Sequence, residues 1–257
     1  MVTSNLMGGL GNYMFQISVA YSLSLDNKDK LIFNINDSLR VHEPIKSYTN
    51  NIFSKINFVE FNLDGLTNYY EPFFHYQKIP LLNNVKLNGY FQSEKYFLHN
   101  RNQILELFEI DEKSKKEIYE KYSEILDGET CSIHVRRGDY LSLNGHHPVC
   151  DLEYYNKSIN LFDKNTKFLV FSDDIKWCQE NFKGENFTFI SGNRDFIDIW
   201  LMSLCQNNII ANSTFSWWGA WLNQNINKKV IAPSKWFGPL KINHNTQDLI
   251  PKTWKII

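Results

Sequence analysis

Short apolar runs alternate with amphipathic stretches along most of this chain, and this alternation limits the folds open to it. Cys131–Val135 and Phe168–Phe171 have the pattern of buried strands, and a helical pattern follows each of them. The N-terminal part has the same order, with a short strand at Met1–Met7 and a helix from Asn12 to about Leu25. Strands that alternate with helices are typical of parallel sheets covered by helices. The pattern therefore predicts an α/β fold.

The predicted elements also divide the chain into two halves. Asp127-Gly128 ends a charged helix, and we place a boundary there between an N-terminal domain, residues 1–127, and a C-terminal domain, residues 128–257. Residues 37–84 show an irregular pattern, for which we expect mixed loops and short elements, and Val230–Ala232 reads as the last strand. Two Rossmann-like halves that face a cleft fit this order. Ligands of open α/β sheets bind beyond the carboxyl ends of the strands, so the residues directly after strands are candidates for a site.

Charge and cysteine content argue against several classes of protein. The formal net charge is −1, which does not suit a protein built for nucleic-acid binding. Cys131, Cys150, Cys178 and Cys205 form no CxxC pair, and their spacing suits neither a zinc site nor a disulfide framework. No run of about 20 apolar residues predicts a membrane span, and no signal peptide is visible. We expect a cytoplasmic protein with reduced thiols.

The first candidate site is His134-Val135-Arg136-Arg137-Gly138-Asp139, at the end of a predicted strand. Two adjacent arginines at a strand end form a fixed, permanently charged clamp for phosphate. In a strand, Arg136 shares a face with His134, whereas Arg137 points the other way unless the strand has ended. One arginine then holds the ligand and the other braces the site. The structural alternatives are a surface ion pair between Arg137 and Asp139 and a core role for His134.

The second candidate is a strand that runs into Asn212-Ser213-Thr214-Phe215-Ser216 and then into an apolar helix. Unpaired N–H groups and the positive dipole end at a helix N-terminus bind phosphate, and the hydroxyls of this run add donors. Capping of the helix is the structural alternative, and it is compatible with phosphate binding. We expect the three tryptophans of that helix to pack in the core.

The third candidate, Met7-Gly8-Gly9-Leu10-Gly11-Asn12, joins the first strand to the first helix. Its glycines allow the backbone to approach a ligand closely. The run is neither GxGxxG nor a P-loop, so it supports neither a dinucleotide site nor a P-loop NTPase. A tight turn between strand and helix is the alternative.

The fourth candidate, Ser172-Asp173-Asp174, follows the buried strand Phe168–Phe171. One carboxylate here can accept hydrogen bonds from N1 and N2 of guanine. Two carboxylates can instead hold a divalent metal, but neighbouring side chains diverge, no third ligand is evident, and the arginines can replace a cation. We therefore expect no metal, and capping of the next helix is the structural alternative. His146 and His147 lie in a segment, residues 144–150, that we expect to be a flexible loop.

Together these motifs resemble the α-1,2-fucosyltransferase family, glycosyltransferase family 11. GGLGNYMFQ is similar to that family's GGLGNQMFQ, with Tyr13 in place of the usual Gln. Four more segments follow in the family's order, namely Gly89–Phe97, His134–Tyr140, Phe171–Cys178 and Ala211–Leu222. The resemblance runs from Gly8 to about Trp236. It implies a GT-B-like fold, a GDP-fucose donor, a galactose 2-hydroxyl as acceptor, inversion at the anomeric carbon and no metal cofactor.

The resemblance also implies roles for single residues. Arg136 would hold the β-phosphate, and His134 and Asp173 would bind guanine. The turn from Ser213 to Ser216 would cradle the diphosphate, while Gly11 and Asn12 would approach the fucose and the reacting hydroxyl. Asp139 and Asn12 are our candidates for receiving the acceptor proton. The alternatives are a transferase that uses another GDP-deoxysugar or makes another linkage, an inactive sugar-binding relative, and a metal-dependent transferase.

Overall fold

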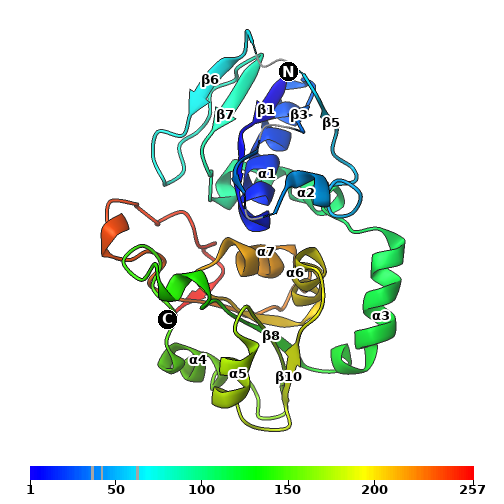
Figure 1. Ribbon diagram of the computed structural model, residues 1–257, viewed down its shortest axis with the longest axis vertical. Coiled ribbons are helices and arrows are strands. Elements are labelled where there is room, and N and C mark those ends of the chain that lie inside the picture. The colour runs from blue at the N-terminus through cyan, green and yellow to red at the C-terminus, as the bar shows by residue number, and fades with distance from the viewer. Residues whose placement is uncertain (36–37, 42, 62–63) are drawn as a thin grey trace. The chain divides into compact units, whose positions relative to one another are not determined.

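The computed structural model describes residues 1–35, 38–41, 43–61 and 64–257. The chain forms two compact units: unit 1 comprises residues 1–111 and 244–251, and unit 2 comprises residues 112–243 and 252–257. The structural boundary precedes helix α3 (Glu112–Leu126), whereas the boundary predicted from the sequence followed it. Helix α3 belongs to unit 2 because it packs against α6 (Asp195–Leu204), as Figure 1 shows.

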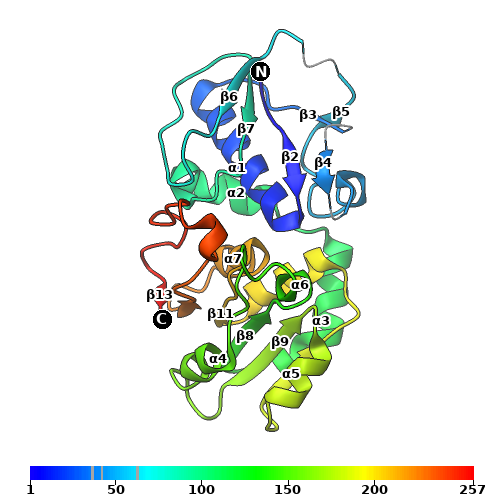
Figure 2. The same ribbon diagram turned by 60° about the vertical axis from the view of Figure 1, so that its left-hand side comes forward.

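Unit 1 is built on parallel strands. Its largest sheet has the order β1-β7-β6, which are Val2–Ser4, Val85–Asn88 and Thr67–Tyr70. Two smaller parallel pairs are β2 with β4 (Leu6–Gly8 and Ser38–Val41) and β3 with β5 (Phe33–Asn34 and Phe58–Val59). The strand expected at Met1–Met7 is therefore two strands. The stretch expected to hold loops and short elements contains the short strands β4, β5 and β6. Figure 2 shows β6 and β7 side by side.

Helix α1 (Leu10–Asn27) is the longest helix of unit 1 and is buried around most of its circumference. Lys28 ends it in the left-handed conformation, with φ 52°. The short helix α2 (Arg101–Leu107) packs against it. Ser93 caps the 3-10 turn Glu94–Tyr96, because its hydroxyl accepts the Lys95 N–H. No helix of the described residues is long and apolar enough to cross a membrane.

Unit 2 contains a parallel sheet with the order β10-β9-β8-β11-β12-β13. Every residue of β8 (Thr130–Val135) is buried, and β9 (Lys167–Ser172) pairs with it along its whole length. The other strands are Phe187–Ile190 (β10), Asn207–Ile209 (β11), Val230–Ala232 (β12) and Lys255–Ile256 (β13). The expectation that β12 is the last strand is wrong, because β13 pairs with it in parallel. The α/β class is confirmed.

Helices cover both faces of this sheet. Figures 1 and 2 show α6 and α7 (Thr214–Leu222) on one face, and α4 (Leu152–Ile159) and α5 (Ile175–Asn181) on the other. Asp151 caps α4, since its side chain accepts the N–H of Tyr154. The tryptophans of α7 are buried in the core, as expected.

The parallel topology gathers three of the predicted motifs at one edge. The strands β9, β8 and β11 are neighbours, and the carboxyl ends of parallel strands share an edge of the sheet. Ser172-Asp173-Asp174 lies at the end of β9, residues 136–139 follow β8, and Asn212-Ser213 lies after β11. This edge of unit 2 is therefore the candidate functional site.

Candidate active site

Arg136 follows β8 directly and lies between two carboxylates. Its Nη2 is 2.7 Å from Oδ1 of Asp139, and its Nη1 is 3.1 Å from Oδ2 of Asp173. The guanidinium carbon also lies 5.5 Å from the ring centroid of Tyr140. The side chain of Arg136 is nevertheless 31% exposed. Arg136 is thus fixed in orientation but accessible to an anion from solvent.

Arg137 has the bracing arrangement that we expected of one arginine. Its backbone N–H donates to Oδ1 of Asp173 at 2.9 Å, and its Nε donates to Oδ2 of Asp174 at 3.0 Å. Its guanidinium carbon lies 4.2 Å from the ring centroid of Trp177. The hydrogen bond from Arg137 lowers the pKa of Asp174. The ion pair expected as an alternative, between Arg137 and Asp139, is not the one that forms, because Asp139 pairs with Arg136.

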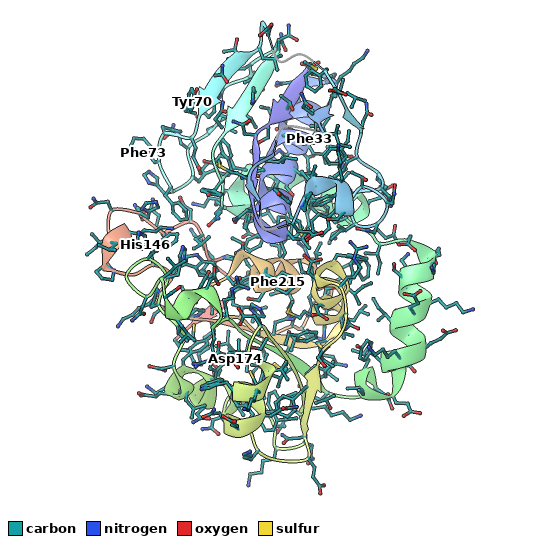
Figure 3. The ribbon with its side chains drawn as sticks, in the orientation of Figure 1. Phe33, Tyr70, Phe73, His146, Asp174 and Phe215 are labelled. Carbon is teal, nitrogen blue, oxygen red and sulfur yellow. The ribbon has the colours of Figure 1, made fainter. Side chains whose placement is uncertain are left out.

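Asp174 also connects this loop to the next helix. Its side chain accepts the N–H of Trp177 and caps α5, so the capping alternative is confirmed for Asp174, which Figure 3 marks. Gly138 leaves room for the neighbouring carboxylate, since a Cβ there would lie 2.6 Å from Oδ2 of Asp173. Any side chain at Gly138 would push Asp173 away from both arginines. This explains why a glycine follows the two arginines.

His134 lies inside β8 and is buried, with 5% exposure. Its Nδ1 is 2.9 Å from the hydroxyl oxygen of Ser216, and its ring centroid is 5.3 Å from that of Phe215. Burial first, and the charge of Arg136 second, lower the pKa of His134 to about 3. The imidazole is therefore neutral at physiological pH. A neutral imidazole offers a directional donor or acceptor rather than a charge.

The turn before α7 divides into an accessible part and a buried part. Ser213, Thr214 and Phe215 are partly exposed, whereas Asn212 and Ser216 are buried. The Ser213 hydroxyl accepts the Phe215 N–H at 3.4 Å, so the predicted capping is confirmed. Figure 3 marks Phe215 at the start of this helix. The accessible part combines hydroxyls with the N-terminal N–H groups of α7, which suits an anion.

The buried part of this turn is held by other segments of unit 2. Nδ2 of Asn212 donates to the backbone oxygens of Pro148 and Trp236, at 2.8 and 3.0 Å. The hydroxyl of Tyr140 donates to the backbone oxygen of Asn212 at 3.1 Å. Asn212 therefore fixes the turn, and its amide is already engaged within the protein.

Residues 144–150 form a loop, as expected, and contacts with other segments hold it. The N–H of Gly238 donates to the backbone oxygen of His146 at 2.9 Å. The ring of His147 stacks on Tyr140 with centroids 4.9 Å apart, and its Nε2 is 2.9 Å from Nζ of Lys241. Burial, followed by the charge of Lys241, lowers the pKa of His147 to about 4. His147 therefore packs behind the tyrosine that faces Arg136.

Gly11 and Asn12 belong to unit 1, at the start of α1. Oδ1 of Asn12 accepts a hydrogen bond from Nε2 of Gln92 at 2.9 Å. Gly8 has φ 90°, and a side chain there would clash with Asn12. The glycine run therefore forms the tight turn that we named as an alternative, and it fixes the Asn12 side chain.

Tyr13, the departure from the family pattern, packs into the core of unit 1. It is fully buried, and its ring meets Tyr48 edge-on with centroids 6.3 Å apart. Its hydroxyl donates to the backbone oxygen of Glu43 at 3.2 Å. Burial raises the pKa of Tyr13 to about 12, so the phenol stays protonated.

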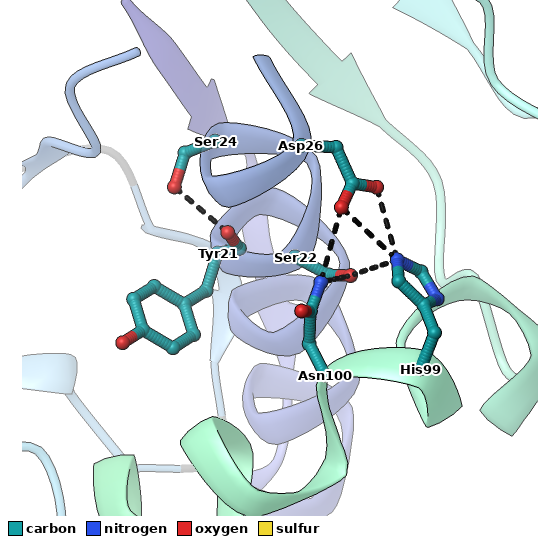
Figure 4. A network of polar contacts seen from close by, with 6 residues as sticks. All are labelled: Tyr21, Ser22, Ser24, Asp26, His99 and Asn100. Atoms are coloured by element: carbon teal, nitrogen blue, oxygen red, sulfur yellow. Dashed lines mark hydrogen bonds and ion pairs between the residues drawn. The ribbon is translucent and has the colours of Figure 1, made fainter. Parts of the chain in front are cut away.

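Another polar cluster of unit 1 consists of side chains that hydrogen-bond to one another, as Figure 4 shows. Nε2 of His99 lies 3.3 Å from the Ser22 hydroxyl oxygen and 3.0 Å from Oδ2 of Asp26. Asn100 donates to both Ser22 and Asp26. A nucleophile relay needs the hydroxyl and the carboxylate on different nitrogens of the imidazole. Here both partners share one nitrogen, so the cluster fastens α1 to residues 99–100 instead of forming a triad.

Sequence reasoning missed two aromatic side chains of the unit 2 site. Tyr140 and Trp177 pack against the guanidinium groups of Arg136 and Arg137. Each lies a few residues after charged residues of a predicted motif, and this position was the signal that could have predicted the contact. Within the part of the chain that the structure describes, no three His, Cys, Asp or Glu side chains are grouped to hold a metal ion.

Parallel α/β units with a charged, cross-braced sheet edge fit the GT-B class of glycosyltransferases, and solved structures agree on the fold. Fucosyltransferase NodZ from Bradyrhizobium matches with a TM-score of 0.55 and 13% identity, over 85% of this chain and 91% of that one. NodZ α-1,6-fucosyltransferase soaked with GDP-fucose matches with the same TM-score, over 86% and 92%. Residues 1–256 match glycosyl transferase family 11, and the chain belongs to that family.

Two relatives from Escherichia coli match almost the whole chain. The O-antigen biosynthesis glycosyltransferase WbnK is 33% identical, over 98% of both chains. An alpha-1,2-colitosyltransferase is 32% identical, over 98% of this chain and 97% of its own. Galactoside alpha-(1,2)-fucosyltransferase 1 of Bos taurus is 30% identical, over 54% of this chain and 43% of its own. The resemblance to the family is confirmed, and the protein is a glycosyltransferase.

Proposed function

We propose that this glycosyltransferase moves L-fucose from GDP-β-L-fucose to the 2-hydroxyl of a galactose in a glycan, with inversion and without a metal. The observation that carries the proposal is Arg136, which two carboxylates orient at the carboxyl edge of the sheet while its side chain stays accessible. Relatives named as α-1,2-fucosyltransferases support the linkage, and the NodZ structure soaked with GDP-fucose supports the donor.

Each part of the donor has a matching group in unit 2. Arg136 and the N–H groups near Ser213–Phe215 bind the diphosphate, while neutral His134 and Asp173 bind guanine. A carboxylate has about four lone-pair sites, so Asp173 can keep its internal partners and still accept from guanine. Because Arg137 and Arg136 already engage Asp174 and Asp173, we expect these carboxylates to be poor metal ligands.

The reaction that we propose is a single displacement. The bond from the acceptor oxygen to the anomeric carbon forms while the bond from that carbon to the β-phosphate oxygen breaks, and GDP leaves with the electron pair. The acceptor proton passes to a base or to water, and Asp139 and Asn12 remain our candidates for the group that receives it. Negative charge grows on the β-phosphate oxygen, and donors aimed at such charge in advance are often the largest contribution to catalysis. Arg136 is that donor in this proposal.

A second donor, GDP-colitose, is favoured by the colitosyltransferase relative, which matches 98% of this chain. Colitose is L-fucose without its 3-hydroxyl, so both donors present the same leaving group and differ at one position. A site that hydrogen-bonds a hydroxyl rejects the analogue without it by roughly 10⁴–10⁵. The ratio of the two transfer rates therefore separates the two donors sharply.

The experiment supplies purified protein, with and without EDTA, with a panel of galactose-terminated oligosaccharides and either GDP-fucose or GDP-colitose. A gain of one fucose on the 2-hydroxyl, measured by product mass and linkage analysis, supports the proposal. Transfer from GDP-colitose alone moves the assignment to the second donor. Binding of GDP-fucose without any transfer identifies a binding protein, and loss of transfer on adding EDTA overturns the metal-independent mechanism.

A further inference from the structure

Tyr140 lies in the 3-10 turn Asp139–Leu141, shortly after the two arginines, and contacts two separate segments of unit 2. The guanidinium carbon of Arg136 lies over its ring, 5.5 Å from the centroid. Its hydroxyl donates to the backbone oxygen of Asn212 at 3.1 Å, across 72 positions of the sequence. Burial raises the pKa of Tyr140, so the phenol stays protonated and remains a donor. One side chain therefore contacts both segments that bind the diphosphate in the proposed function.

The contact with the ring orients Arg136 without using its hydrogen-bond donors. A guanidinium has five N–H donors in one plane. Asp139 and Asp173 accept from the edge of that plane, at Nη2 and Nη1. An aromatic ring attracts the cation through its π electrons and takes no N–H group. Tyr140 can therefore hold Arg136 in place while the N–H groups bind a phosphate.

The hydroxyl of Tyr140 fixes a second donor, the N–H of Ser213. The oxygen of Asn212 and the N–H of Ser213 belong to one peptide group, which is planar and trans, so they point in opposite directions. Because Tyr140 holds that oxygen, it also sets the direction of the N–H. Within the described part of the chain, no oxygen accepts the Ser213 N–H. This donor, at the start of α7, is thus free of a partner in the protein.

A second aromatic contact holds the Tyr140 ring itself. His147 stacks on it, with centroids 4.9 Å apart and an interplanar angle of 23°. The His147 ring also meets that of Phe237 with centroids 5.5 Å apart, and its Nε2 is 2.9 Å from Nζ of Lys241. A ring that is packed in this way keeps one orientation, which a positioning role requires.

We propose that Tyr140 is a positioning residue, which aims Arg136 through its ring and the Ser213 N–H through its hydroxyl at one diphosphate. This role deepens the proposed function and rests on it for the identity of the anion. Tyr140 does not touch the reacting atoms and acts only through the two donors. Donors that folding has already oriented bind more tightly than donors that must be ordered by the ligand. Loss of Tyr140 therefore weakens the binding of a diphosphate.

The test measures GDP binding to the full chain by isothermal titration calorimetry. Tyr140→Phe keeps the ring and removes the hydroxyl, and we expect it to raise the dissociation constant of GDP about threefold. Tyr140→Leu removes both contacts, and we expect a rise of about tenfold. Tyr154→Phe is the matched control, because its hydroxyl donates to the backbone oxygen of Ile210, just before Asn212, at 2.7 Å. The control should lose stability and keep the dissociation constant of wild type.

A double-mutant cycle separates positioning from a general loss of packing. In the Arg136→Ala background the ring has no guanidinium to orient, so Tyr140→Phe and Tyr140→Leu should weaken GDP binding equally. Saturation-transfer NMR, which detects weak binding, measures the constants in this background. An extra loss from Tyr140→Leu that persists without the arginine overturns the role of the ring. Denaturant unfolding verifies that each variant is folded, and Tyr140→Met replaces Tyr140→Leu if that variant is not.

The outcomes distinguish the role of Tyr140 from the proposed function. Equal dissociation constants in wild type, Tyr140→Phe and Tyr140→Leu overturn the role of Tyr140 and leave the donor assignment standing. Absence of GDP binding by the wild type overturns both. The expected order of constants in a protein that transfers no fucose supports the role of Tyr140 and contradicts the proposed transfer.

Discussion

The two largest parallel sheets of this protein end in opposite chemistry. After β8 and β9 of unit 2, Arg136 and Arg137 interlock with three aspartates. After β6 and β7 of unit 1, Glu71 accepts the backbone N–H groups of Tyr90 and Phe91 and faces Tyr69 and Tyr96. The first edge presents cationic side chains held by carboxylates, and the second presents a carboxylate held by the backbone. Similar strand-and-loop architecture thus ends in unlike chemistry, because the residues after each strand are free of the packing that fixes the strand itself.

Removal of Arg136 should have the largest effect at the charged edge of unit 2. We expect Arg136→Ala to lower the transfer rate by about 10²–10³, the usual effect of losing one donor to a developing charge. Steady-state kinetics of GDP release in the presence of acceptor measure this loss.

Arg136→Lys is the matched control for charge. Lysine keeps the positive charge but lacks the planar fork that contacts Asp139 and Asp173 together. We expect partial activity, between that of wild type and that of Arg136→Ala. Full activity in Arg136→Ala would show that the anion is held elsewhere and would remove the contrast between the two edges.

At the edge of unit 1, Glu71→Gln should change how the free energy of unfolding depends on pH. Burial raises the pKa of Glu71 from 4.5 to about 7 in the folded state, in spite of its backbone hydrogen bonds. Between these values the folded protein keeps a proton that the unfolded chain has lost, so the wild type loses stability as pH rises. Tyr69 and Tyr96 face the carboxylate, and their raised pKa values keep them neutral in this range.

The glutamine variant does not titrate, which makes it the reference. Its free energy of unfolding relative to wild type should therefore rise by about 2–3 kcal/mol between pH 4.5 and pH 7.5. Denaturant unfolding at several pH values measures the slope, and the constant cost of the lost carboxylate hydrogen bonds does not affect it. A difference that stays flat with pH would show that folding does not raise the pKa of Glu71.

The sequence predicted unit 2 better than unit 1, for physical reasons. Strand β8 is buried throughout and therefore has a continuous apolar pattern, which places Arg136 and Arg137 at its end. In contrast, β6 is a largely exposed edge strand, Thr67–Tyr70, and lacks such a pattern. The proximity of Glu71 to Tyr90 and Phe91 depends on the pairing of β6 with β7, which no local pattern reports.

Local sequence patterns also predicted neither the ion-pair partners in unit 2 nor the boundary between the two units. Asp139 pairs with Arg136 rather than Arg137 because Asp173 and Asp174 approach from β9 and engage Arg137. Helix α3 reads as a charged connector from its sequence. Its buried Ile118 and Tyr122 nevertheless attach it to unit 2, where the Tyr122 hydroxyl donates to Oδ1 of Asn193 at 2.8 Å.

Asp139→Asn tests whether Asp139 orients Arg136 or acts as the catalytic base. Because Asp139 orients Arg136, we expect a loss of transfer rate of about tenfold from misplacing the guanidinium, with the shape of the pH–rate profile kept. A general base would contribute about 10²–10⁴ and would impose its own ionisation on the profile. Initial rates from pH 5 to pH 9 measure both quantities. A loss in the larger range, together with a flattened acid limb, would instead identify Asp139 as the base.

Tyr13→Phe should have the smallest effect, and it tests whether this departure from the family lies in the core or in the site. The Tyr13 hydroxyl makes one hydrogen bond, to the backbone oxygen of Glu43, and the ring is fully buried against Tyr48. Phenylalanine keeps the ring and removes that bond, whose net worth is about 0.5–1.5 kcal/mol. Water can solvate the Glu43 oxygen in its place, because Glu43 is exposed, so we expect the lower end of that range. Denaturant unfolding measures this loss, and the transfer rate should stay within about twofold because the hydroxyl points to the protein's own backbone. A tenfold fall in rate at unchanged stability would place the phenol among the groups that contact substrate.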